Sequence, residues 1–320
     1  MLTVSGAILA YLLSDIRHAA PETFADLLDK PKNWWCFAAA PLCYTTALLV
    51  GLFRWYLLGV VLRFNLRFRD IIRIGSFAYI VEILSIGLAG ADAARATMLA
   101  RTAPKFAASA IISVLFDRLL GGYALLCFVS LNGWIANPTD GVVQAALHTL
   151  QAMTVGATLG LVLWLLFPRL APWVSGRALR FGRAGNFVAQ AVETVDVYRS
   201  HLPLLALAFA QTIIVLTLTS TSFFLLASGT PGGAPTWQEH TLIVPLLLLS
   251  ALVPLPMQGL GVVDYTLSYL YQHAAAAPPH VGQGLVVAMA VRLTSISVGG
   301  LAALYYALSR PPVGSTHDDL

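Results

Sequence analysis

One stretch breaks a long apolar run: Val253-Pro254-Leu255-Pro256-Met257-Gln258-Gly259-Leu260-Gly261. Proline removes a backbone donor and crowds the preceding turn, so this stretch cannot continue a helix. The surrounding segment 241–271 is apolar enough to lie in a membrane, where non-helical backbone is tolerated only inside protein or beside water. We therefore predict a broken helical hairpin in the protein interior. Its hinge residues are Pro254, Pro256, Gly259 and Gly261.

A similar pattern occurs earlier in the chain. Gly87-Leu88-Ala89-Gly90-Ala91-Asp92 also follows an apolar run, as Gly259-Leu260-Gly261-Val262-Val263-Asp264 does. Each acid precedes an arginine in an apolar segment, Arg118 or Arg292, and then a glycine pair, Gly121-Gly122 or Gly299-Gly300. Duplicated broken segments with intramembrane charges mark the central pathway of many transporters. We predict Gly87 and Gly90 as the first hinge.

The composition identifies a membrane protein. Hydrophobic residues make up 58% of the 320 residues, charged residues make up 11%, and the mean hydropathy is +0.76. A soluble domain carries about 25% charged residues. We therefore predict an all-α, polytopic inner-membrane bundle that forms one integral membrane domain over 1–320.

Six apolar runs are predicted to cross the membrane, since about 20 residues suffice for one crossing. The shortest run, 1–14, has no basic start and no small-residue cleavage site, so we interpret it as a retained first helix rather than a signal peptide. The other predicted spans are 34–62, 106–131, 142–167, 203–228 and 284–308.

Arginine and lysine orient these helices. Basic residues gather in 63–73, 95–105 and 168–200, whereas the 15–33 loop has three basic residues against four acids and three other connections contain none. The connections without Lys or Arg are 132–141, 229–240 and 272–283. Because cytoplasmic loops carry the excess of positive charge, the basic connections are predicted to be cytoplasmic, with both termini on that side. The connector 168–200 alternates arginine with apolar residues and is predicted to be an amphipathic cytoplasmic segment.

This orientation predicts an inverted repeat. Segment 74–91 lies between two basic clusters, so we expect it to enter from the cytoplasm and return, whereas 241–271 enters from outside. Roughly 34–131 then forms one half of the protein and 203–308 forms the other. In the alternative, both segments cross fully and the bundle has eight crossings.

The intramembrane charges need partners. An arginine or aspartate at a helix centre costs about 2.5–3.5 kcal/mol on the translocon scale. Neighbours in a helix point about 100° apart, so Asp117 and Arg118 each require a partner from another element. Asp92 and Arg95 are candidate partners from the first hairpin, and Arg292 is predicted to meet Asp264 in the second half.

Two interpretations of these charges stay open. They either form a polar cavity that receives a charged head group, or ion pairs that fix helix positions, and one group can do both. Glu82, within the first hairpin, is a candidate proton or ion site or a solvated carboxylate. The candidate substrate-binding residues are Asp92, Arg95, Asp117, Arg118, Asp264 and Arg292.

Four motifs in this order carry a family resemblance. They are Gly90-Ala91-Asp92-Ala93-Ala94-Arg95, Asp117-Arg118, Pro256 to Asp264, and the helix that carries Arg292. With them the chain resembles the flippase-like family named for the transmembrane region of lysylphosphatidylglycerol synthases. The chain departs from the family motif at Gln258, where a glycine is usual, and at Asp264, where a glutamate is usual.

The resemblance implies a role with lipids. Relatives are thought to move or bind phospholipids, polyprenyl-linked lipids or hopanoids. The chain ends shortly after Arg310, without the aminoacyl-transferase domain of full synthases, so we do not expect lysine transfer. The scattered Ser, Thr and His residues have no adjacent activator, so we expect no enzyme activity.

We therefore expect a lipid flippase or transporter that binds a polar or anionic head group in an intramembrane groove. The alternative is a non-transporting subunit that recruits or regulates a lipid-modifying enzyme. No sequence pattern indicates a cofactor, a metal site or a nucleic-acid partner.

Overall fold

The protein is all-helical throughout the part that the computed structural model describes. That part comprises residues 29–62, 64, 66–84, 87–102, 107–167, 176–177, 192, 196–250, 256–259 and 261–309. Most of the predicted connector 168–200 and the whole of the predicted first helix, 1–14, lie outside these residues.

Five helices in this part are long and apolar enough to cross a membrane. They are α3 (Trp34–Val61), α6 (Ala107–Ala136), α7 (Gly141–Leu166), α10 (Leu202–Gly229) and α14 (Gln283–Leu308). Four agree with the predicted spans to within one residue at each end, and α6 extends beyond the predicted 131 to Ala136. The polytopic helix bundle is confirmed. The total of six crossings stays a prediction, because 1–14 is not described.

The first hairpin is longer than predicted. Helices α4 (Phe68–Leu84) and α5 (Gly87–Thr102) pack against each other, and together they extend beyond the predicted 74–91 at both ends. The position of the hinge also differs, because α5 begins at Gly87 and Gly90 lies one turn inside it. Glycine lowers the stability of a helix but does not by itself end it. Gly90 lies within α5 and is therefore not at the break.

The second hairpin contains three helices in its described residues. Its helices are α11 (Trp237–Ser250), the short α12 (Pro256–Gly259) and α13 (Val262–His273). Gly259 and Gly261, which the sequence predicts as hinge residues, adopt positive φ values of 71° and 90° that glycine tolerates readily. Pro256 begins α12, and Pro254 lies outside the described residues.

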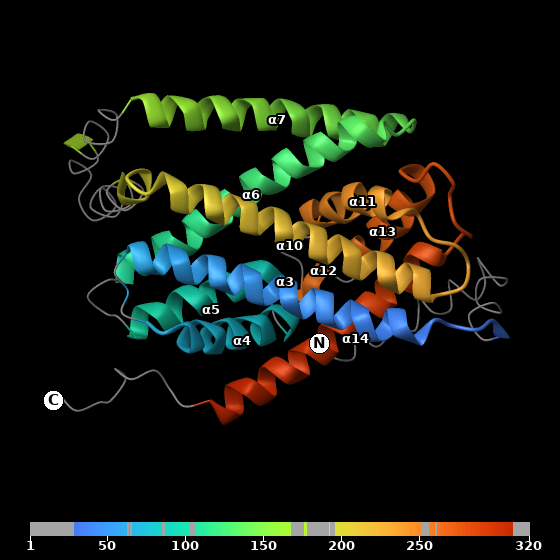
Figure 1. The fold of residues 1–320 in the computed structure, drawn as a ribbon, viewed down its shortest axis with the longest axis horizontal. Helices are drawn as coiled ribbons and strands as arrows, with labels where there is room; N and C mark the ends of the chain where they lie inside the picture. Colours follow the sequence, from blue (N-terminus) through green and yellow to red (C-terminus); the bar gives the residue numbers. More distant parts are fainter. Residues whose placement is uncertain are drawn as a thin grey trace.

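The two hairpins lie at opposite ends of the bundle. Figure 1 shows α4 and α5 toward one end of the bundle, where α4 packs against α3, and α11 and α13 toward the other end, where α11 packs against α10, with α12 between them. Helix α12 packs against α4 and α5, so the broken tips meet inside the protein. Each hairpin reaches along only part of the long helices, as expected for re-entrant segments.

The order of elements is the same on both sides of α7. A long helix, a broken hairpin and a second long helix occur in α3 to α6 and again in α10 to α14. The sequence repeat proposed for 34–131 and 203–308 stays a prediction, although this order agrees with it.

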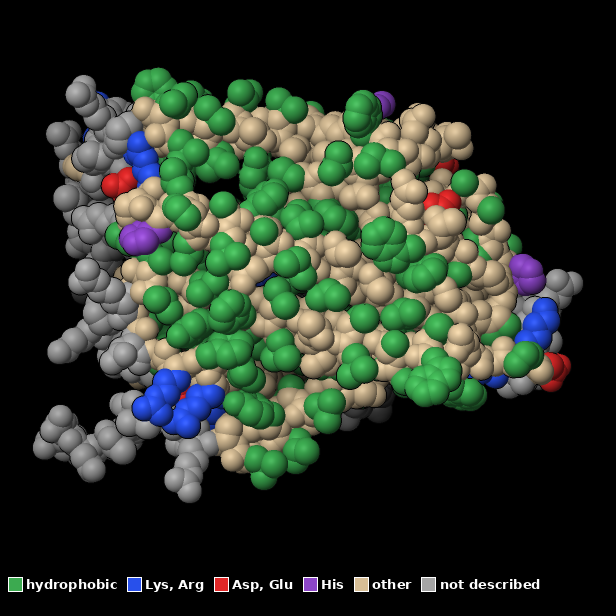
Figure 2. Space-filling view, in the orientation of Figure 1, with side chains coloured by type: hydrophobic (Ala, Val, Ile, Leu, Met, Phe, Trp, Pro, Cys, Tyr) green, Lys and Arg blue, Asp and Glu red, His purple; other side chains and the backbone are tan. Residues whose placement is uncertain are grey.

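The bundle core is built around α3 and α10, which pack along their lengths. Helix α7 contacts mainly α6, and its apolar side chains are largely exposed. Apolar side chains cover much of the visible surface, and Lys and Arg gather chiefly at the end where α3 leads into α4 (Figure 2). Near that end, Tyr198 stacks on Phe116 with ring centroids 4.2 Å apart and donates to the carbonyl of Leu58 at 3.3 Å.

The close contact between α13 and α14 requires a glycine. A Cβ at Gly284 would lie 2.5 Å from the Cα of Ser268, whereas a Cβ at Gly300 on the same helix would meet no atom within 4 Å. We expect Gly284→Ala to lower the free energy of unfolding by roughly 1–3 kcal/mol, the usual cost of overpacking. Thermal unfolding in detergent measures this, and Gly300→Ala is the control. Equal stability of the two variants would contradict the packing described.

Candidate functional site

A partly exposed ion pair joins the first hairpin to α6. Arg118 donates through Nε to both carboxylate oxygens of Asp92, at 2.9 and 2.7 Å, and through Nη2 to Oδ1 at 2.6 Å. Asp92 lies on α5, so the pair fixes the returning arm of the hairpin against a long helix. This is the partner that the sequence predicted for Arg118.

Arg95 is the third member of this group. Its Nη1 lies 3.8 Å from Oδ1 of Asp92, one turn earlier on α5, and its guanidinium carbon lies 5.9 Å from the ring centre of Trp55. The Nε of Arg95 is buried and has no hydrogen-bond partner among the described residues. Arg95 therefore retains donor capacity that Asp92 does not use.

Glu82 faces the same group from α4. Its carboxylate interacts with the charges of Arg95, Arg118 and Asp92, and with the side chain of Gln258 from the second hairpin. Two carboxylates and two guanidinium groups thus come from α4, α5 and α6. We call Glu82, Asp92, Arg95 and Arg118 the central charge cluster.

A second ion pair lies at the hinge of the second hairpin. Arg292 donates to Asp264 through Nε at 2.9 Å and through Nη2 at 2.7 Å. The same carboxylate accepts from the amide of Gly261 at 2.8 Å, which satisfies a free donor at the start of α13. Asp264 therefore fixes both the hinge and its contact with α14, as the predicted pairing required.

The partner of Asp117 is a residue that the sequence analysis did not name. Arg54 on α3 donates to its carboxylate through Nε at 2.8 Å and Nη2 at 3.0 Å, and to Thr212 on α10 through Nη1 at 2.6 Å. Gly121 faces this guanidinium, since a Cβ there would lie 3.4 Å from it. Arg54 could have been found by applying the same rule, because it is an isolated charge in an apolar span.

Exposure separates the three pairs. The side chain of Arg118 is 31% exposed and that of Asp92 is 25% exposed. The corresponding values are 17% and 3% for Arg292 and Asp264, and 10% and 4% for Arg54 and Asp117. The pair of Arg118 and Asp92, within the central charge cluster, is therefore the most exposed of the three.

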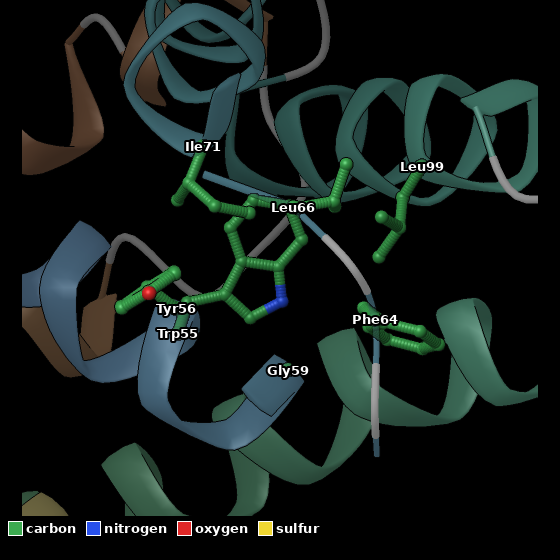
Figure 3. A pocket seen from close by; sticks show the side chains of 7 residues that line it. All are labelled: Trp55, Tyr56, Gly59, Phe64, Leu66, Ile71 and Leu99. Atoms are coloured by element: carbon green, nitrogen blue, oxygen red, sulfur yellow. The ribbon is translucent and has the colours of Figure 1, made fainter. Parts of the chain in front are cut away.

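An apolar pocket adjoins this cluster through Trp55. Figure 3 shows its lining, with the indole of Trp55 at its centre. The lining residues are Trp55, Tyr56, Gly59, Phe64, Leu66, Ile71 and Leu99. The pocket is small and apolar, and the guanidinium of Arg95 lies over the same indole.

The model of the lysylphosphatidylglycerol synthase TM region matches residues 1–303. The chain belongs to this family. No curated protein and no solved structure matches it.

Family membership and the five apolar helices identify a multi-pass membrane protein related to lipids. The synthase-family motifs named from the sequence lie at the two hairpins and on the long helices that pack against them. In the part of the chain that the structure describes, no group of three or more His, Cys, Asp or Glu residues is placed to hold a metal ion.

The buried pair should matter most for stability. We expect Arg54→Ala to lower the free energy of unfolding by about 3–5 kcal/mol, because Asp117 would remain as an unpaired buried charge. Replacing both residues with leucine should restore much of this loss. The control is Asp196→Ala, which removes a 48% exposed partner of Arg199 and should change stability by about 0–1 kcal/mol. Thermal unfolding in detergent compares them, and an Arg54→Ala protein as stable as the control would refute the assignment.

Proposed function

We propose that the protein moves a lipid with a polar or anionic head group between the leaflets of the inner membrane, without using a nucleotide. The observation that carries this proposal is the partial exposure of the Arg118 and Asp92 pair within an otherwise apolar bundle. A charged group in such a place is costly and is commonly functional.

Arginine suits the recognition of a phosphate group. Its guanidinium stays charged and offers several donors in one plane, which match phosphate oxygens in pairs. Asp92 engages Nε and Nη2 of Arg118, so an incoming anion would contact the remaining Nη1 side. The donors of Arg95 that Asp92 leaves unused would complete the site.

The other two pairs would position the site rather than bind the ligand. Asp264 and Arg292 hold the hinge of the second hairpin, and Asp117 and Arg54 hold α3 against α6. Their low exposure supports this division of roles. The lipid tails would remain in the bilayer beside the exposed apolar faces of α6 and α7.

Removal of the central arginines tests the transport role. We expect Arg118→Ala and Arg95→Ala each to slow head-group translocation about 10- to 100-fold, because a hydrogen bond to a charged group contributes about 1.5–3 kcal/mol. Proteoliposomes with head-group-labelled phospholipid and an impermeant quencher measure the rate. Arg101→Ala is the control, since that side chain is exposed at the end of α5.

Translocation at the parent rate in both folded variants would refute this mechanism. If the parent protein moves no lipid and a lipid-modifying enzyme co-purifies with it, the partner role replaces the transport role.

The orientation can be tested with single cysteines. In a background without Cys36, Cys43 and Cys127, Thr97→Cys and Thr236→Cys should react with an impermeant thiol reagent from opposite sides, since both positions are exposed. Position 97 should be labelled from the cytoplasm and position 236 from outside. Labelling of both from one side would contradict the inverted arrangement and the cytoplasmic placement of the termini.

A further inference from the structure

Gln258 adopts a backbone conformation that L-amino acids rarely occupy. Its φ is 57°, next to Gly259 at 71°, at the tip of the second hairpin. Glycine adopts such values readily, whereas a residue with a Cβ is strained there. Gln258 therefore carries a side chain at a position where the backbone conformation favours glycine.

The carboxamide of Gln258 lies where several helices meet. Its Oε1 accepts a hydrogen bond from Ser295 Oγ on α14 at 3.2 Å. Ser295 Oγ lies 2.8 Å from the hydroxyl of Tyr79 on α4, which in turn lies 3.3 Å from the hydroxyl of Tyr44 on α3. These contacts fix the orientation of the Gln258 amide.

Helix α12, which carries Gln258, packs against α4 and α5, which carry Glu82, Asp92 and Arg95 of the central charge cluster. Because Oε1 is used as an acceptor, the remaining groups of this side chain are the two N–H donors of Nε2. The carboxylate of Glu82 interacts with the Gln258 side chain and also with Arg95 and Arg118. A carboxylate accepts what the amide can donate, so the two groups are complementary.

We propose that Gln258 is a positioning residue that holds the Glu82 carboxylate in the head-group site. It thereby makes the geometry of the central charge cluster depend on the tip of the opposite hairpin. This inference rests on the proposed function. Strained backbone persists where the surrounding contacts determine it, and it often occurs at functional sites.

The test is Gln258→Gly, a change that the backbone favours. We expect a melting temperature equal to or above that of the parent, together with a translocation rate at least fivefold lower in proteoliposomes. The matched control is Asn137→Gly, which relieves a positive φ of 42° at the end of α6, away from the site. It should leave the rate unchanged.

A double-mutant cycle separates positioning from a general structural role. In a Glu82→Gln background, Gln258→Gly should cause less than a twofold further loss, because residues in one network do not act additively. The inference is wrong if the losses of translocation rate caused by Glu82→Gln and Gln258→Gly multiply in the double variant. It is also wrong if Gln258→Gly has the parent rate or a melting temperature below that of the parent. If Arg118→Ala is slow while Gln258→Gly is not, this inference fails alone; if both translocate at the parent rate, the proposed function fails as well.

Discussion

An arginine in an apolar helix has to be matched by a carboxylate from another element, and this constraint determines how the bundle is assembled. Arg118 with Asp92 joins α6 to α5, Arg292 with Asp264 joins α14 to α13, and Arg54 with Asp117 joins α3 to α6. Dispersion and small residues bring membrane helices close, but they discriminate weakly between registers. A buried charge left without its partner is strongly penalised, so each pair selects one register and one hairpin position.

The three ion pairs differ in the exposure of their side chains, and this difference suggests that they have different roles. In the pair on α3 and α6, Arg54 also donates to Thr212 and lies against Gly121, so this pair fixes the two helices against each other. The pair on α13 and α14 also satisfies the amide of Gly261, so it supports the non-helical hinge. The pair on α5 and α6 stays partly open and has Arg95 and Glu82 beside it. A preorganised binding site requires side chains that their neighbours hold in place. The two buried ion pairs would hold the more exposed central charge cluster in this way.

The sequence predicted the long helices well, because continuous apolar runs have few other stable states in lipid. It predicted two of the three ion pairs, because acid and arginine recur at similar spacing in both halves. Arg54 was missed because no repeated motif marks it, although it is an isolated charge in an apolar span. Gly90 was wrongly placed at the break, since glycine content alone does not end a helix. The φ of Gln258 could not be predicted, because it follows from contacts with α4 and α14 that exist only in the folded chain.

Helix α7 packs against little besides α6, yet the arrangement depends on it. In the predicted arrangement, each group of a long helix, a re-entrant hairpin and a second long helix returns the chain to the membrane face on which it started. Two such groups joined directly by a loop would share one polarity, and both hairpins would open on the same face. A single additional crossing changes the parity of the path, so the second group starts from the opposite face. The contribution of α7 is therefore topological. It allows two similarly ordered groups to enter the membrane from opposite faces, so that the tips of their hairpins meet.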